Sequence, residues 1–129
     1  MSDSAYDRLL HYIDEITKSY DKIRQFESEG CSKEDLEKEL RHMRDISGEF
    51  PSIITLFFKE NPNYVSILEK FIDMFKPPFI QILNTHLLLF SLPQNADSAW
   101  IKVQISMAIN YLNGSGWVDG IKGIRTFLK

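Results

Sequence analysis

Apolar residues recur at alternating spacings of three and four positions through the first part of the chain, and this period constrains the fold more than any other feature. The residues that follow it are Tyr6, Leu9, Ile13, Ile16, Tyr20 and Ile23, with charged residues between them. Such spacing places apolar side chains on one side of an α-helix, which we expect from about Ser4 to Ser28. No segment has the strict alternation of a β-strand, so the sequence predicts an all-α fold.

Glycine, proline and capping residues divide the rest of the chain into further helices. Gly30 ends the first helix, and Ser32 with Asp35 forms a capping-box pattern that starts the second. Gly48 and Pro51 predict that this helix breaks or kinks. The remaining helices are expected over Ser52 to Lys59, Pro62 to Phe75, Pro78 to Leu92, Trp100 to Gly114 and Trp117 to Leu128, which makes about seven in all.

The segment from Pro78 to Leu92 is apolar on nearly all sides, as is typical of a helix surrounded by others. We therefore expect it to be the central helix of a bundle. Its apolar run is shorter than the roughly twenty residues that a membrane-spanning helix needs. In the next helix, Trp100, Val103, Met107, Tyr111 and Leu112 are expected to form the apolar side.

Composition indicates one globular domain over residues 1–129. The chain has 43% hydrophobic and 26% charged residues, with nine Phe and five Tyr, which argues against disorder. The net charge of -3 gives no long-range attraction for a phosphate backbone, so nucleic acid is not an expected partner. With a lone Cys31, no secretory leader and no membrane anchor of its own, the chain is expected to be intracellular and cytoplasmic.

The sequence carries no pattern typical of catalysis. Its three histidines, His11, His42 and His86, are scattered over different predicted helices, and no zinc-binding motif or glycine-rich phosphate loop is present. We expect neither an enzyme nor a cofactor or metal. His86, on the most apolar helix, is interpreted as a core histidine bonded to a neighbouring carbonyl, and Cys31 as an inert thiol.

Three segments resemble homology motifs of the Bcl-2 family, in the order in which that family has them. In the second predicted helix, Leu40, Met43 and Asp45 are similar to the third motif. The first helix, from Tyr6 to Tyr20, resembles the fourth motif, and the segment around Gly116 and Trp117 resembles the second. The resemblance covers nearly the whole chain, is closest to divergent viral pro-survival homologues, and implies the Bcl-2-like helical bundle.

The chain departs from the family at the first motif. In place of Asn-Trp-Gly-Arg it has Pro78-Phe79-Ile80-Gln81. The arginine of the family pairs with an aspartate of the ligand, whereas Gln81 offers only a neutral hydrogen bond. Lys76 is the other candidate for this role, and the sequence does not decide between the two.

The resemblance implies a receptor for the death-motif helix of pro-apoptotic Bcl-2 proteins. In a ligand helix, the residue before Asp45 would be small, but here it is Arg44. Sequestration of that helix in an apolar groove would inhibit apoptosis, with recruitment to the mitochondrial surface by partners. The expected groove residues are Ile46, Phe50, Ile54, Phe57, Leu68, Phe71, Met74, Phe75, Phe79, Gln81 and Ile82.

Three alternatives stay open at the level of sequence. A homodimer would cover an exposed apolar patch. A pro-apoptotic member of the same family would permeabilise membranes through its apolar central hairpin. An unrelated helical adaptor or scaffold would match the motifs only because amphipathic helices share such spacings.

Overall fold

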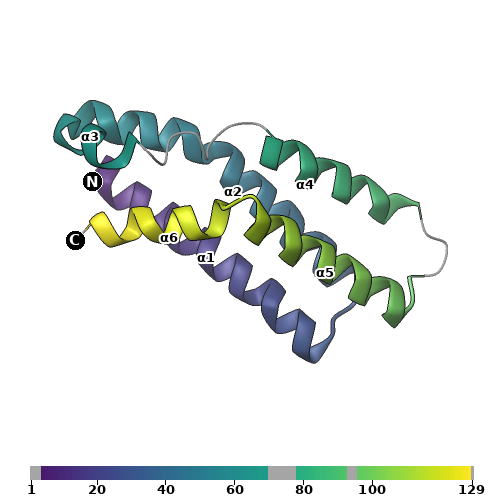
Figure 1. Ribbon diagram of the computed structural model, residues 1–129. Coiled ribbons are helices and arrows are strands. Elements are labelled where there is room, and N and C mark those ends of the chain that lie inside the picture. Colours follow the sequence, from purple (N-terminus) through teal and green to yellow (C-terminus); the bar gives the residue numbers. More distant parts are fainter. Residues whose placement is uncertain (1–3, 70–77, 93–95, 129) are drawn as a thin grey trace.

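The computed structural model describes residues 4–69, 78–92 and 96–128, and within these ranges the chain is helical and contains no β-strand. The all-α fold predicted from the sequence is confirmed. Within the described ranges, two short 3-10 helices accompany six α-helices, which Figure 1 shows in their arrangement. The elements are α1 Ala5–Glu29, α2 Lys33–Glu60, η1 Pro62–Tyr64, α3 Val65–Leu68, α4 Pro78–Leu88, η3 Leu89–Ser91, α5 Ser98–Gly114 and α6 Trp117–Phe127.

The α1 helix begins and ends at the residues that the sequence indicates. The Ser4 side chain accepts a hydrogen bond of 3.1 Å from the Asp7 amide at the N-terminus. At the C-terminus, Gly30 has a φ of 79°, a conformation that residues with a Cβ rarely adopt. The chain then turns, and Ser32 caps α2 by accepting a hydrogen bond of 3.0 Å from the Asp35 amide.

The α2 helix is longer than predicted, because it continues through Gly48 and Pro51 to Glu60. The prediction of a separate third helix over Ser52 to Lys59 is therefore wrong, and the described residues contain six α-helices where about seven were expected. A proline inside a helix removes one hydrogen bond and costs about 3 kcal/mol. Phe50, Ile53 and Phe57 are buried on either side of it, and burial of such side chains stabilises by roughly 1.5–3 kcal/mol each, enough to offset that cost.

The core lies between the α1–α2 pair and the α5–α6 pair. In Figure 1, α1 and α2 run antiparallel, and α5 and α6 follow one another across them. Trp117 at the start of α6 packs edge-on against Phe50 of α2, with ring centroids 5.7 Å apart. Other fully buried core residues come from all four helices and include Leu9, Ile13, Ile16, Leu36, Leu40, Met43, Ala108, Leu112, Ile121 and Ile124.

The α4 helix packs on α2 and α5 at the edge of the molecule (Figure 1). Leu83, His86, Leu87 and, in η3, Phe90 point into the protein, whereas Ile82 and Leu88 are exposed. The prediction that this segment is a central helix surrounded by others is thus wrong. Its outward side carries exposed apolar residues, Ile82 and Leu88, in addition to the buried ones, so its composition resembles that of a buried helix.

Candidate functional site

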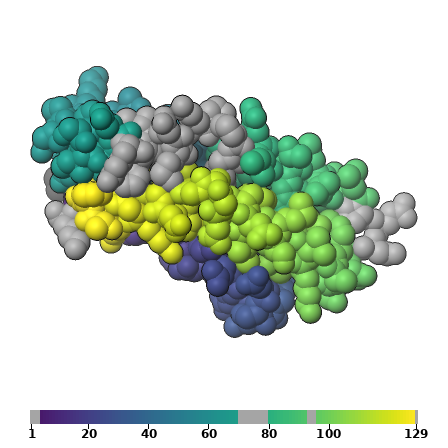
Figure 2. Space-filling view, viewed as in Figure 1, coloured from purple at the N-terminus to yellow at the C-terminus, as the bar shows by residue number. Residues whose placement is uncertain are grey.

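Exposed large apolar side chains gather on α4, η3 and α5. Ile82 is 45% exposed, Val103 55% and Met107 39%. Leu88 at the end of α4 is 68% exposed, and Leu92, which follows η3, is 72% exposed. Helices α4 and α5 lie side by side at one end of the molecule (Figure 2). We call the surface formed by these two helices and η3 the α4–α5 face. Clustered exposed apolar residues are typical of a protein-interaction surface.

The α4–α5 face is also nearly free of charge. Between Pro78 and Gly114 the sequence has only one acidic residue, Asp97, and one basic residue, Lys102. Asp97 caps α5, where its side chain accepts a hydrogen bond of 2.8 Å from the Trp100 amide. Lys102 lines a different hollow, together with Glu27, Ile105 and Ser106. Depletion of charge is a property of the centre of protein interfaces.

A hollow of about 450 Å³ lies on this face. Its lining side chains come from both helices and are Gln81, Ile82, Thr85, His86, Met107 and Tyr111. This volume falls within the range of protein pockets that receive a ligand or a partner side chain, about 300–1,000 Å³. The hollow thus combines apolar walls with a few polar groups, which is the composition of a specific binding pocket.

The polar floor of the hollow is a hydrogen-bonded network around His86. The Gln104 Oε1 atom can only accept a hydrogen bond, so His86 donates from Nε2 over 2.8 Å. His86 Nδ1 then accepts from the Tyr111 hydroxyl, also over 2.8 Å. Burial lowers the pKa of His86 below its ordinary value of 6.5, although the hydrogen bond to Gln104 opposes this shift. Burial also raises the pKa of Tyr111. The interpretation of His86 as a core histidine is confirmed.

Aromatic packing fixes the position of α4 and η3 against α5. His86 lies edge-on to Tyr111 at a centroid distance of 5.4 Å and to Phe90 at 5.5 Å. Phe90 in turn packs against Trp100 at 5.2 Å. These edge-to-face contacts contribute about 0.5–1.5 kcal/mol each beyond the area that they bury. These rings therefore pack α4 and η3 against α5 beside the hollow.

The structure brings together only part of the predicted groove. Gln81 and Ile82 line the hollow on the α4–α5 face. Phe50, Ile54, Phe57 and Leu68 are instead buried in the core, so they form no open groove wall here, and Ile46 is half-buried. Phe79 lies in the first turn of α4. The predicted groove residues Phe71, Met74 and Phe75, and the proposed ligand-binding Lys76, lie outside the described residues.

The residues of the family-like motifs have clear structural roles. Leu40 and Met43 are buried between helices, while Asp45 is exposed and forms an ion pair of 3.0 Å with its neighbour Arg44. Gly116 has a φ of 77° at the start of α6, a left-handed conformation that favours glycine. Trp117, which follows it, is buried against Phe50. The Gly-Trp pair thus starts a helix that covers the core.

Sequence reasoning missed Val103 and Met107 as surface residues. They were expected on the apolar side of their helix together with Leu112, which is buried. The buried side of α5 is formed by Ile101, Gln104, Ile105, Ala108, Ile109 and Leu112. Gln104 is inward because its polar group is bonded to His86. The signal that points to this surface is the nearly charge-free stretch from Pro78 to Gly114, since exposed helices normally carry a charged side.

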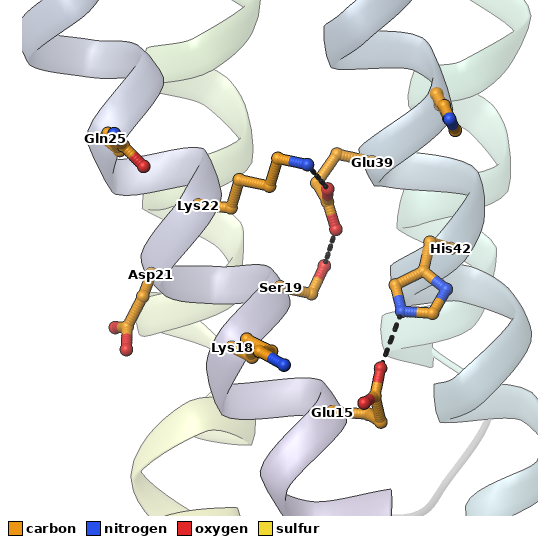
Figure 3. Close-up of a pocket in the computed structure, with 9 residues that line it drawn as sticks. Glu15, Lys18, Ser19, Asp21, Lys22, Gln25, Glu39 and His42 are labelled. Atoms are coloured by element: carbon orange, nitrogen blue, oxygen red, sulfur yellow. Dashed lines mark hydrogen bonds and ion pairs between the residues drawn. The ribbon is translucent and has the colours of Figure 1, made fainter.

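A second hollow, of about 610 Å³, lies between α1 and α2 and is lined by charged groups. Figure 3 shows Ser19 and Lys22 of α1 facing Glu39 of α2. The buried Glu39 carboxylate accepts a hydrogen bond of 2.7 Å from Ser19 Oγ and lies 3.4 Å from Lys22 Nζ. His42 Nε2 lies 3.2 Å from Glu15 Oε2. These contacts join the two helices, so the polar groups of this hollow serve the pairing of α1 with α2.

Two further features bear on possible chemistry. In the part of the chain that the structure describes, no cluster of three or more His, Cys, Asp or Glu side chains is placed to hold a metal ion. Burial, with a smaller effect of Asp35, raises the pKa of the Cys31 thiol, which reduces the thiolate fraction and hence its reactivity.

Among the described residues, no helix is both long and apolar enough to cross a membrane.

The chain has no match among known protein-family models, curated proteins or solved structures.

Proposed function

We propose that the chain is a receptor for an amphipathic helix of a partner protein, which it binds on the α4–α5 face. The single observation that carries this proposal is an apolar, nearly charge-free surface beside a hollow with a polar floor. By the resemblance to the Bcl-2 family, the partner is the death-motif helix of a pro-apoptotic protein. Holding that helix away from its targets would inhibit apoptosis.

The apolar character of the face suits a helix with apolar residues every three or four positions. One apolar side chain of the partner would fill the hollow between Ile82 and Met107, and neighbouring ones would contact Val103 or Leu88. The exposed Gln81 and Thr85 at the rim would orient the bound helix through neutral hydrogen bonds. Affinity would then come from apolar burial, about 25 cal/mol for each Å² removed from water.

The resemblance supports the choice of partner through the order of the motifs. The first helix carries the fourth-motif pattern, α2 the third and the start of α6 the second. The location of the ligand differs from the sequence-based expectation, because Phe50, Ile54 and Phe57 are closed off in the core. A helix could reach those residues only after a neighbouring segment had moved, whereas the α4–α5 face needs no rearrangement.

A titration with a fluorescent third-motif peptide tests the proposal. We expect saturable binding by fluorescence anisotropy, and loss of at least tenfold in affinity when the conserved leucine of the peptide is replaced by alanine, because a cavity in a packed site costs about 2–5 kcal/mol. The matched protein variants are Met107→Glu on the face and Ile67→Glu, which changes an equally exposed apolar residue on α3. Absence of saturable binding, or equal loss in both variants, would contradict the proposal.

A second candidate function rests on the composition of the same segment. The hairpin of α4, η3 and α5 carries only Asp97 and Lys102 as charged residues, as a segment that inserts into membranes would. In that case the chain would be a pro-apoptotic, membrane-permeabilising protein of the family. Release of a trapped dye from liposomes by the pure protein would favour this function over sequestration, and intact liposomes would leave the receptor as the better account.

A further inference from the structure

We infer that His86 is a proton switch at the floor of the α4–α5 hollow. An apolar group that closes the hollow binds while the imidazole is neutral and is released when the imidazole takes up a proton. This switch rests on the proposed function for its natural ligand and adds the way in which that site is regulated. Its physical basis is one titratable side chain that is buried between two helices and lines an apolar site.

His86 connects α4 with α5 through both of its ring nitrogens. The side chain is buried, with Nε2 2.8 Å from Gln104 Oε1 and Nδ1 2.8 Å from the Tyr111 hydroxyl. In a neutral imidazole one nitrogen donates a hydrogen bond and the other accepts one. The neutral ring therefore satisfies both partners, by donating to Gln104 and accepting from Tyr111.

Protonation of His86 reverses one of these hydrogen bonds and breaks neither. Both nitrogens of an imidazolium are donors, so the bond to Gln104 is unchanged. At Nδ1 the Tyr111 oxygen has to accept, which a hydroxyl can do as well as donate, and its hydrogen turns away from His86. The contacts between α4 and α5 are thus kept, and what changes is the charge at the floor of the hollow.

The helices on either side of His86 supply little that would compensate this charge. No Asp, Glu, Lys or Arg is present in α4 or η3. On α5, Lys102 lines a different hollow, and Asp97 caps the first turn of the helix. The hydrogen-bond and ring partners of His86 among the described residues are uncharged, namely Gln104, Tyr111 and Phe90.

The α2 helix also packs on α4, and its nearby charged groups have other partners. Arg44 forms an ion pair of 3.0 Å with Asp45, and Glu49 accepts a hydrogen bond from Tyr12 of α1. Within the part of the chain that the structure describes, no carboxylate pairs with His86. An imidazolium at this position is consequently stabilised mainly by the water that reaches it through the hollow.

A ligand that closes the hollow removes this water. An apolar side chain between Ile82 and Met107 buries the floor further, which disfavours the charged form of His86. Since ligand and proton affect each other by the same factor, the proton weakens binding of the ligand. His86 is neutral with and without ligand above its pKa, so affinity is constant there, and below that pKa it falls by at most about tenfold for each pH unit.

Nitrogen NMR of the chain with labelled histidine tests the state of the ring. We expect Nε2 to carry the proton at neutral pH, and the ring to become doubly protonated at a midpoint below 6.5, because burial lowers the pKa of His86. Gln104→Glu should raise this midpoint by about one to three pH units, since it places a carboxylate beside the Nε2–H group. A ring protonated at Nδ1 at neutral pH, or a midpoint that Gln104→Glu does not raise, overturns the inference.

Titrations with two probes across this pH range test the release. The first probe is the third-motif peptide, followed by fluorescence anisotropy. The second is indole, a small neutral apolar molecule, followed through the methyl resonance of Met107. For both probes we expect constant affinity above the His86 midpoint and a progressive loss below it. Far-UV circular dichroism at each pH should show constant helix content, which distinguishes release of the probe from unfolding.

Three variants connect the loss of affinity to His86. His86→Gln can donate and accept like the neutral ring but does not titrate, so the pH dependence should largely disappear. In Gln104→Glu the loss should begin at a higher pH, together with the raised midpoint. His11→Gln, which removes an exposed histidine of α1, is the matched control and should retain the pH dependence of the wild type.

Each outcome decides between the switch and the receptor function. Affinity that is independent of pH, or a loss that persists in His86→Gln, overturns the switch, and so does a loss of helix content that follows the His86 titration. If indole binds and is released as expected but the peptide does not bind at any pH, the switch stands and the proposed receptor function fails. If neither probe binds, both fail. If the peptide binds equally at every pH, the receptor function stands and the switch fails.

Discussion

Replacement of His86 by leucine should destabilise the protein through the group that it leaves behind. His86 makes two hydrogen bonds of 2.8 Å, and both it and Gln104 are buried. Leucine fills much of the space of the imidazole ring, so the cavity is small. The Gln104 carbonyl oxygen, however, loses its donor. An orphaned buried polar group costs about 1–3 kcal/mol, and we expect a loss of that size in the free energy of unfolding.

A second substitution, at Gln104, should not add its full cost. Gln104→Leu alone leaves the His86 Nε2–H group without its acceptor, and it should also cost about 1–3 kcal/mol. In the double variant His86→Leu with Gln104→Leu, both polar partners are gone. Removing both members of a buried pair can be nearly neutral, so the double variant should be more stable than the sum of the single effects predicts, by about 1–2 kcal/mol.

Urea unfolding followed by far-UV circular dichroism measures all four corners of this cycle. The pH should be held well above 6.5, the ordinary pKa of histidine, so that His86 is neutral in the folded and the unfolded chain. Midpoints should shift while the slope with urea stays constant, since the surface exposed on unfolding hardly changes. Single effects that add within about 0.5 kcal/mol would mean that the two residues are energetically independent, and the network at the floor of the hollow would be refuted.

Three further predictions follow from other parts of the structure. As pH falls through 6.5, the free energy of unfolding should decrease, because the unfolded chain takes up a proton at His86 that the folded chain resists. Urea titrations at several pH values should show this decrease, and the decrease should be smaller in His86→Leu. Gly30→Ala should lower the free energy of unfolding by about 1–3 kcal/mol, because Gly30 has φ 79° and ψ 168°. Gly48→Ala should raise it by about 0.5–1 kcal/mol, because Gly48 lies inside α2 with open space around it. Thermal melts that rank these two variants the other way would contradict the effect of backbone conformation. Ser19→Ala should lower the free energy of unfolding by about 1.5–3 kcal/mol, because it removes a hydrogen bond to the buried Glu39 carboxylate. Ser28→Ala, at the exposed end of α1, is the control and should change the free energy of unfolding by less than about 0.5 kcal/mol in the same chemical denaturation assay.

Local signals in the sequence predicted the helix ends well. Ser4, Gly30 and Ser32 act through hydrogen bonds and dihedral angles within a few residues, so no knowledge of the rest of the fold is needed. The same holds for Gly116 at the start of α6. These positions are determined by backbone geometry, which a short stretch of sequence specifies.

The predictions that failed depend on contacts between distant segments. Pro51 ends many helices, but here burial of Phe50 and Phe57 keeps α2 continuous. Val103 and Met107 fit an apolar stripe as well as Ile105 and Ala108 do, and only packing against the rest of the fold selects which side is covered. An apolar helix that serves an interaction surface has the same composition as a central one, so the edge position of α4 could not be predicted from its own residues.

The location of the bound helix is the central claim, and photo-crosslinking measures it directly. A third-motif peptide with a photoreactive group in place of one apolar anchor would be irradiated in complex with the wild-type protein, and the modified residues identified by mass spectrometry. The proposed site predicts adducts on α4 and α5, concentrated on residues such as Ile82, Thr85 and Met107. Specific adducts confined to α1, α2 or α6, competed by unlabelled peptide, would contradict the assignment of the α4–α5 face as the receptor surface.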